Sequence, residues 1–333
     1  MPQKPRIVTN SFFILKNFFS FHTLSYNSRK MTTKKKNIQE ESYFEGEKEE
    51  ALGDLWVWLG IPTEDLPHCI NYIAENALPL PLAKKDSGQQ SHKISQVYPR
   101  WPVDIRFLLT TTHKHNKETC QLSSFCILMK GYPNSLQING VYPWKSGVEG
   151  YVSASLEDGP SMDFLAPLFY REGNDYDINL WVTVYLSALA LEIQPAKEEV
   201  LTFSEGELYE IELKDFLQTN PGKTKKDFPH ITVSTKNMTA FLPAGITSRY
   251  QYRAKILKVL PMDPFEDIEM FNLLVLLTGE TPKNSLTVHL YVKKSDVHKY
   301  TPKEGDFIEG ILWMFGTTHF MTGAFPTSNS IVE

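Results

Sequence analysis

The alternation of hydrophobic and polar residues predicts a short helical region followed by β-strands. Before residue 80 the apolar spacing is helical, at Leu52, Leu55, Trp56 and Leu59, and Gly60 marks a stop. Pro62 then opens a second predicted helix that runs to Ala77. In this small helical cap we expect Trp56 and Trp58 to belong to the core rather than to an aromatic ligand platform.

Residues 79–102 are predicted to be a linker, so that cap and linker together span 51–102. They contain four prolines and a polar run without periodicity. Beyond them, β-branched and aromatic residues predict strands at 105–112, 122–130, 150–156, 162–169 and 180–193. Glu157-Asp158-Gly159-Pro160 is typical of a hairpin turn. We therefore expect a β domain over 103–217.

A second connector is predicted over residues 218–248. Its most polar part is Asn220-Pro221-Gly222-Lys223-Thr224-Lys225-Lys226, which combines turn residues with clustered positive charge. A run of this kind is normally a solvated loop, and a phosphate contact is the alternative.

Residues 249–333 show the order of strands that a small closed barrel needs. Strands are predicted at 252–260, 270–277 and 286–293, and a polar segment at 295–303 precedes a fourth strand that Gly305-Asp306 opens. Glycine suits this strand start because it accepts a positive φ. The stretch 305–312, with the strands before it, resembles the oligonucleotide/oligosaccharide-binding barrel, or OB-fold, in which a short segment crosses to the fourth strand.

This resemblance covers about a fifth of the chain, and small SH3-like barrels produce a similar pattern. Upstream, residues 150–191 repeat the order of strand, hairpin, linker and strand without the Gly-Asp pair. A tandem of related barrels is one interpretation, and two unrelated strand-rich units are the other. The expected fold class is mainly β, with two strand-rich barrel-like domains, the C-terminal one OB-like, behind the N-terminal helical cap.

A candidate nucleic-acid-binding face follows from the alternation within two of these strands. If their apolar residues are buried, the opposite side carries Arg253, Lys255, His289 and Tyr291. Basic side chains follow a phosphate backbone and an aromatic ring stacks on a base, so this set suits a single strand. An ordinary solvated face is the alternative, because residues 249–320 contain nine Lys and Arg and nine Asp and Glu.

The composition describes a folded chain without an obvious spanning helix. Of the 333 residues 41% are hydrophobic, but the longest apolar runs fall short of the roughly 20 residues that a membrane span needs. The net charge of −5 argues against coating nucleic acid by bulk electrostatics. Cys69, Cys120 and Cys126 do not suit a disulfide-stapled secreted domain. We therefore expect a cytoplasmic protein with no membrane partner.

Residues 1–50 are expected to lie outside the fold. Residues 32–50 are rich in Lys and Glu and almost lack apolar side chains, which predicts disorder. Residues 1–30 contain no acid and have a Phe-rich centre, so a signal peptide and an organellar transit peptide are two accounts of them. The third, which we favour, is a mis-called extension, with translation starting at Met31.

The lack of a recognisable catalytic motif favours a binding protein over an enzyme. The sequence has no Gly-x-Ser-x-Gly elbow, no Gly-rich phosphate loop and no His-Glu-x-x-His. One cluster has metal-ligand chemistry but a spacing unlike structural zinc sites, so no metal site is predicted: His113, His115, Cys120 and Cys126. Isolated acids could supply the carboxylates of a glycosidase, but we expect them to be solvated: Asp158, Asp163, Glu172, Asp175 and Asp177.

The sequence thus predicts a non-enzymatic binding protein without a cofactor. Single-stranded nucleic acid is the first candidate partner, through the C-terminal barrel. A protein partner, with no nucleic-acid role, is the alternative.

Overall fold

The computed structural model describes residues 55–56, 58–80, 91–98, 104–114, 120–262, 269–279, 284–297 and 300–319. The described residues belong to two compact units. Residues 196–240 form one, which we call the insert, and the other described residues form the main body. Predictions for residues 1–50 lie outside the described ranges.

The predicted helical cap is confirmed at the start of the main body. Leu55, Trp56, Trp58 and Leu59 are helical and buried, and Gly60 follows them with a φ of 82°. The second predicted helix consists of η2 (Thr63–Asp65) and α2 (Leu66–Asn76). Trp56 stacks on Phe125 with ring centroids 4.3 Å apart, so the prediction that the tryptophans are core residues is confirmed.

A four-stranded antiparallel sheet follows the cap. Its strands are β1 (Leu78–Pro79), β2 (Ser91–Tyr98), β3 (Ile105–Lys114) and β4 (Cys120–Met129), in that order. The strands β3 and β4 were predicted, whereas β2 lies in the predicted linker. Its sequence has weak strand character, but eight of its residues pair with β3.

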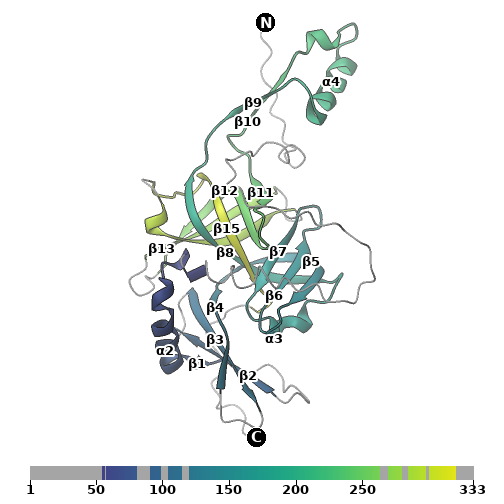
Figure 1. The fold of residues 1–333 in the computed structure, drawn as a ribbon. Helices are drawn as coiled ribbons and strands as arrows, with labels where there is room; N and C mark the ends of the chain where they lie inside the picture. The colour runs from purple at the N-terminus through teal and green to yellow at the C-terminus, as the bar shows by residue number, and fades with distance from the viewer. Residues whose placement is uncertain are drawn as a thin grey trace. The chain divides into compact units, whose positions relative to one another are not determined.

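Eight strands of the main body close into a barrel (Figure 1). They are β5 (Tyr132–Pro143), β6 (Gly150–Ser155), β7 (Ser161–Ala166), β8 (Trp181–Pro195), β12 (Arg249–Leu260), β13 (Met270–Thr278), β14 (Leu286–Lys293) and β15 (Phe307–Thr317). The short β11 (Ala240–Pro243) lies beside β12. All but β5 and β11 were predicted, and the fold is mainly β as expected.

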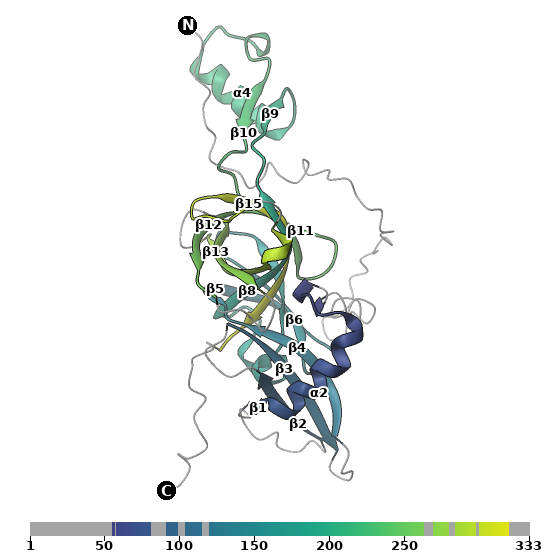
Figure 2. The same cartoon turned by 90° about the vertical axis from the view of Figure 1, so that its left-hand side faces the viewer.

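The long strands β8 and β15 pair with each other and divide the barrel into two circuits of five strands. The upstream circuit contains β5, β6, β7, β15 and β8. The downstream circuit contains β12, β13, β14, β8 and β15, which form a ring in Figure 2. Each circuit is closed by the last strand of the other, so the two strand-rich regions share one body.

The two circuits have the same local geometry where the fourth strand begins. The first strand of each carries a register shift, after Ile138 in β5 and after Ile256 in β12. Ile138 exchanges backbone hydrogen bonds of 2.7 and 3.0 Å with Asn179 and Leu180. Ile256 does the same with Asp306 and Gly305, which directly precede β15, at 2.8 Å each.

Positive φ values at two equivalent residues permit this turn. Gly305 has a φ of 90°, as its position at the strand start predicted, and Asn179 has a φ of 68°. Asparagine enters this region more easily than most residues do. The upstream repeat therefore lacks the Gly-Asp pair but makes the same turn.

One apolar core fills the barrel and a second cluster covers part of its outside. The inward residues of both circuits belong to a single cluster that includes Leu136, Val184, Ala254 and Leu312. Outside, Tyr291, Trp313 and Phe315 pack with the cap and the four-stranded sheet. The outer side of β14 is therefore partly covered by the main body itself.

Short helical turns connect the barrel strands. They are α3 (Phe169–Glu172), η3 (Gly173–Asp175) and η5 (Lys294–Asp296). The first two lie between β7 and β8, and η5 lies between β14 and β15. Within the described ranges, no helix has the length and apolar character needed to cross a bilayer.

The insert has a small core of its own. It contains β9 (Val200–Phe203), α4 (Glu207–Thr219), η4 (Lys225–Asp227) and β10 (Ile231–Ser234), and β9 pairs with β10. Phe203, Tyr209, Leu213 and Val233 are buried together. The predicted domain boundary after residue 217 falls inside α4, and the polar run 220–226 leads into η4.

Candidate nucleic-acid interface

The structure places the four predicted binding residues on the outward side of β12 and β14, but only Lys255 is exposed. Arg253, His289 and Tyr291 are 6%, 7% and 0% exposed. The prediction that these three side chains face solvent is wrong. Their strand alternation was correct, but the outward side of a barrel strand is not open where other parts of the chain pack on it.

Arg253 is held by its neighbour on β15. It pairs in register with Glu309, and its Nη1 lies 3.6 Å from Glu309 Oε2. Gln194 Nε2 also donates to Glu309 Oε1 at 3.3 Å. Both charged groups are buried, so breaking this ion pair should destabilise the barrel.

His289 and Tyr291 belong to a buried polar network between β14 and the four-stranded sheet. His289 Nδ1 lies 2.9 Å from Asn272 Oδ1, and Asn272 Nδ2 donates to Asp104 Oδ2 at 2.9 Å. Tyr291 Oη donates to the carbonyl of Lys130 at 2.9 Å. Lys130 Nζ lies 3.5 Å from Asp104 Oδ1. These contacts hold the sheet against β14.

Burial sets the protonation of this network. It lowers the pKa of His289 to about 4, with a further lowering from Lys130 and an opposing effect of Asp104. Burial and then Asp104 raise the pKa of Tyr291. Because Asn272 Nδ2 donates to Asp104, Asn272 Oδ1 acts as the acceptor and neutral His289 carries its proton on Nδ1. His289 is thus uncharged at neutral pH and offers no cation to a phosphate.

The exposed part of this side of the barrel differs from the predicted set. Lys255 and Lys258 are both exposed on β12 and pair in register with Leu276 and Leu274 of β13. The two leucines are half-buried. Tyr132, at the start of β5, is 37% exposed, and its ring centroid lies 6.3 Å from that of His289.

We call the surface formed by Lys255, Lys258, Leu274, Leu276 and Tyr132 the lysine face. Leu274 pairs with His289 on its other side, so the face runs from β12 across β13 to β14 and the tyrosine beside it. Simple alternation along β12 does not place Lys258 on this side, because the bulge after Ile256 shifts the register by one residue. Tyr132 comes from a strand far away in sequence, and no local signal points to it.

The predicted solvated acids do not all behave as expected. Asp158 is exposed in a turn, but Glu172 is fully buried and accepts hydrogen bonds from Tyr176 Oη and the Thr318 amide, both at 3.0 Å. His319 Nδ1 lies 3.3 Å from Glu172 Oε1 and 3.8 Å from Asp175 Oδ2. The hydrogen bond to Glu172 raises the pKa of His319. This cluster ties the end of β15 to the linker before β8.

The metal-ligand candidates gain no support from the described residues. His115 and the side chains of His113 and Cys120 lie outside what the structure describes. Cys126 is fully buried in β4, and burial raises the pKa of its thiol. Among the described residues, no three His, Cys, Asp or Glu side chains are grouped closely enough to hold a metal ion.

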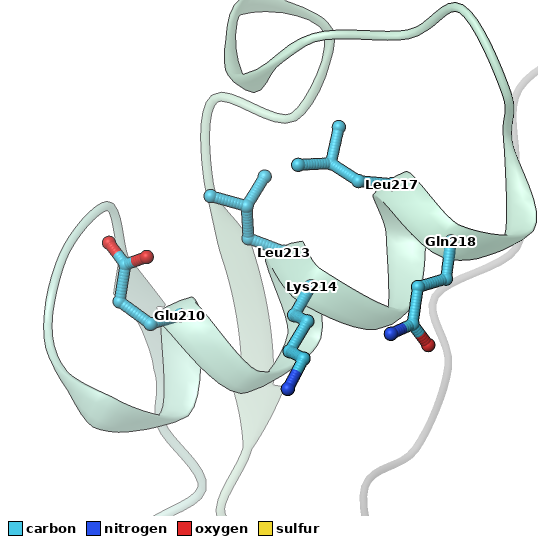
Figure 3. Close-up of a pocket in the computed structure, with 5 residues that line it drawn as sticks. All are labelled: Glu210, Leu213, Lys214, Leu217 and Gln218. Atoms are coloured by element: carbon cyan, nitrogen blue, oxygen red, sulfur yellow. The ribbon is translucent and has the colours of Figure 1, made fainter.

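A shallow hollow of about 350 Å³ lies along α4 of the insert (Figure 3). Its lining consists of Glu210, Leu213, Lys214, Leu217 and Gln218, which project from successive turns of the one helix. A ligand site normally brings polar groups from several elements together. This hollow does not, and we assign it no ligand.

Comparison with known proteins identifies no relative: no family model, no curated protein and no solved structure matches the chain. The lysine face and the barrel that carries it are therefore the basis for proposing a function.

Proposed function

We propose that the protein is a non-enzymatic binding protein that takes single-stranded nucleic acid on the lysine face. The observation that carries this proposal is the exposure of Lys255 and Lys258 on the same side of the barrel as Leu274, Leu276 and Tyr132. Cations beside an apolar and aromatic surface are the combination that a single strand requires.

The arrangement assigns a different part of the ligand to each group. Neighbouring strands lie about 4.8 Å apart, so the face extends roughly 10 Å from β12 to β14. Lys255 and Lys258 contact phosphates at one edge, and Tyr132 stacks on a base at the other. Leu274 and Leu276 form the apolar floor between them. Arg253, His289 and Tyr291 support the face from within and do not touch the ligand.

The topology of the downstream circuit supports this choice of ligand. Its first three strands form a meander, a short segment crosses to the fourth, and a strand parallel to the third closes the ring. This strand order resembles that of an OB-fold barrel, with β8 in the place of the closing strand. In OB-folds the face of the second and third strands binds oligonucleotides, and here those strands are β13 and β14.

Fluorescence anisotropy with a labelled single strand of about 16 nucleotides, the upper site size of an OB-fold, tests the proposal. We expect binding at micromolar protein in low salt. Lys255→Glu with Lys258→Glu should weaken binding at least tenfold and reduce the salt slope by about 1.4, since each phosphate contact contributes about 0.7. Tyr132→Ala should cost about 1–3 kcal/mol of binding free energy.

Lys214→Glu with Lys236→Glu is the matched control, because it makes the same charge change at two exposed residues of the insert. It should leave the affinity unchanged. Absence of binding by the unaltered protein, or equal affinity of the double variant of the lysine face and the control, would refute the proposal. A protein partner is the second candidate function, and exposed apolar residues of the upstream circuit favour it.

A further inference from the structure

Because the two circuits are equivalent, the upstream circuit has an outward face that corresponds to the lysine face. Ile138 and Ile256 occupy the same position in their circuits, so Gln137 of β5 corresponds to Lys255 of β12. Gln137 pairs in register with Trp181, and Lys255 pairs with Phe307. Trp181 therefore occupies the position in the upstream circuit that Phe307 occupies in the downstream circuit, where Phe307 lies beside the lysine face.

The upstream face is more apolar than its counterpart. Ile178 is 54% exposed, Leu180 54% and Trp181 48%. We call these three residues the tryptophan patch. Their counterparts in the downstream circuit are Glu304, Asp306 and Phe307, of which two are charged. Adjacent exposed apolar side chains on a folded surface are characteristic of a docking site.

The charge around the tryptophan patch is negative. Residues 172–183 contain no Lys or Arg, and Asp175 and Asp177 are exposed beside the patch. The turn that follows the neighbouring strand β6 carries exposed Glu157 and Asp158. On the other side, half-buried Arg171 precedes Glu172, and His319 contacts Asp175 at 3.8 Å. Phosphate groups are disfavoured here, whereas Lys and Arg side chains are favoured.

We propose that the tryptophan patch is a docking surface for a protein segment that combines apolar side chains with Lys or Arg. Tryptophan is among the commonest anchors of protein interfaces, where it packs into a desolvated centre. The acids at the rim select a basic partner and orient it. The proposal goes beyond nucleic-acid binding, because it gives the equivalent faces of the two circuits opposite charge and different partners.

Binding of defined peptides to the full chain tests this inference. The probe is a fluorescein-labelled peptide of alternating leucine and lysine, compared with peptides in which glutamate replaces lysine or serine replaces leucine. We expect micromolar binding of the leucine–lysine peptide alone. Ile178→Ser with Trp181→Ser should weaken it at least tenfold, and Asp177→Lys should weaken it severalfold.

Leu122→Ser is the matched control, since Leu122 is 45% exposed on β4 and should tolerate the same change without loss of peptide binding. All substituted residues are exposed, and circular dichroism checks that the variants fold. Equal binding of the three peptides, or no loss in the double variant, contradicts the proposal. So does a concentration-dependent dimer that the double variant abolishes, which would make a second copy the occupant.

The oligonucleotide assay separates this inference from the proposed function. The double variant of the tryptophan patch should bind the single strand as the unaltered protein does. If it loses that affinity too, the patch belongs to the nucleic-acid site and the inference fails. If no single strand binds the protein at all, the peptide result still decides whether the patch docks a basic segment.

Discussion

At the scale of residues, the environment of a side chain rather than its type decides its role. His289 and Lys255 both lie on the outward side of barrel strands, yet one is 7% exposed and the other is open to solvent. The buried imidazole has a pKa of about 4, so it stays neutral and acts as a hydrogen-bond donor to Asn272.

The buried state of His289 predicts an acid-sensitive stability. Its pKa falls from 6.5 to about 4 on folding, so the unfolded chain binds more protons between those values. The contribution is therefore fully present above about pH 6.5 and is lost as the pH falls. Between pH 7 and pH 5 we expect a loss of about 2 kcal/mol in the free energy of unfolding, measured by urea denaturation.

A variant that cannot titrate isolates this effect. His289→Asn should lower stability at neutral pH and show a flatter dependence between pH 5 and pH 7. His68→Asn, at an exposed residue of α2, should keep the dependence of the unaltered protein. If the His289 variant keeps the full pH dependence, the buried imidazole is not its source.

At the scale of elements, both fourth strands begin with a residue of positive φ. Asn179 and Gly305 occupy this position, and each amide donates to the bulge residue of its first strand. The turn fixes the register of a long strand that serves two circuits. An error there would displace pairs in both, which explains why the two repeats keep this feature although their residues differ.

Substitutions at these two positions of positive φ should cost conformational free energy, and at Gly305 they should cause no steric clash. Nothing lies within 4 Å of where a Cβ would stand on Gly305, so Gly305→Ala costs only the left-handed backbone, about 1–2 kcal/mol. Asn179→Ala should cost about 1 kcal/mol and Asn179→Gly should be nearly neutral. Chemical denaturation measures these changes, with Asn174→Ala in η3 as the control. Equal effects of Ala and Gly at position 179 would argue against the φ explanation.

At the scale of the whole molecule, the barrel is assembled from segments that the insert separates in sequence. The strand β8 precedes the insert, but it pairs with β14 and β15, which follow it. Such non-local pairing requires the chain to close long loops before contacts form, which predicts slow folding. Once formed, the shared pair makes both circuits depend on each other, so we expect them to unfold together.

The insert should be dispensable for the main body. The Thr235 amide donates to the Glu199 carbonyl at 2.9 Å, so the two ends of the segment lie side by side. Replacing residues 200–234 by Asn-Gly should leave the melting temperature within a few degrees, because the insert has its own core. Calorimetry and the oligonucleotide assay measure the outcome. Loss of soluble protein or of a large part of the melting temperature would show that the main body needs the insert.

The sequence by itself determined the local structure of most of this protein. Strand propensity located β6, β7, β8 and the strands from β12 onward. Helical spacing located the turn of helix before Gly60, and the start signal at Pro62 located α2. The predicted positive φ of Gly305 was also correct. These features depend on neighbouring residues alone. The strand β5 was missed because Pro133, Asn134, Gly140 and Pro143 are typical of loops.

The tertiary structure alone decided how the segments combine and which side chains reach solvent. Alternation assigns a residue to one side of a strand, but it does not say what packs on that side. Arg253, His289 and Tyr291 were therefore misjudged, while Tyr132 joined the candidate site from a strand that no local pattern revealed. The exchange of β8 and β15 between circuits could not be predicted either, because backbone hydrogen bonds between distant segments do not depend on the local sequence pattern.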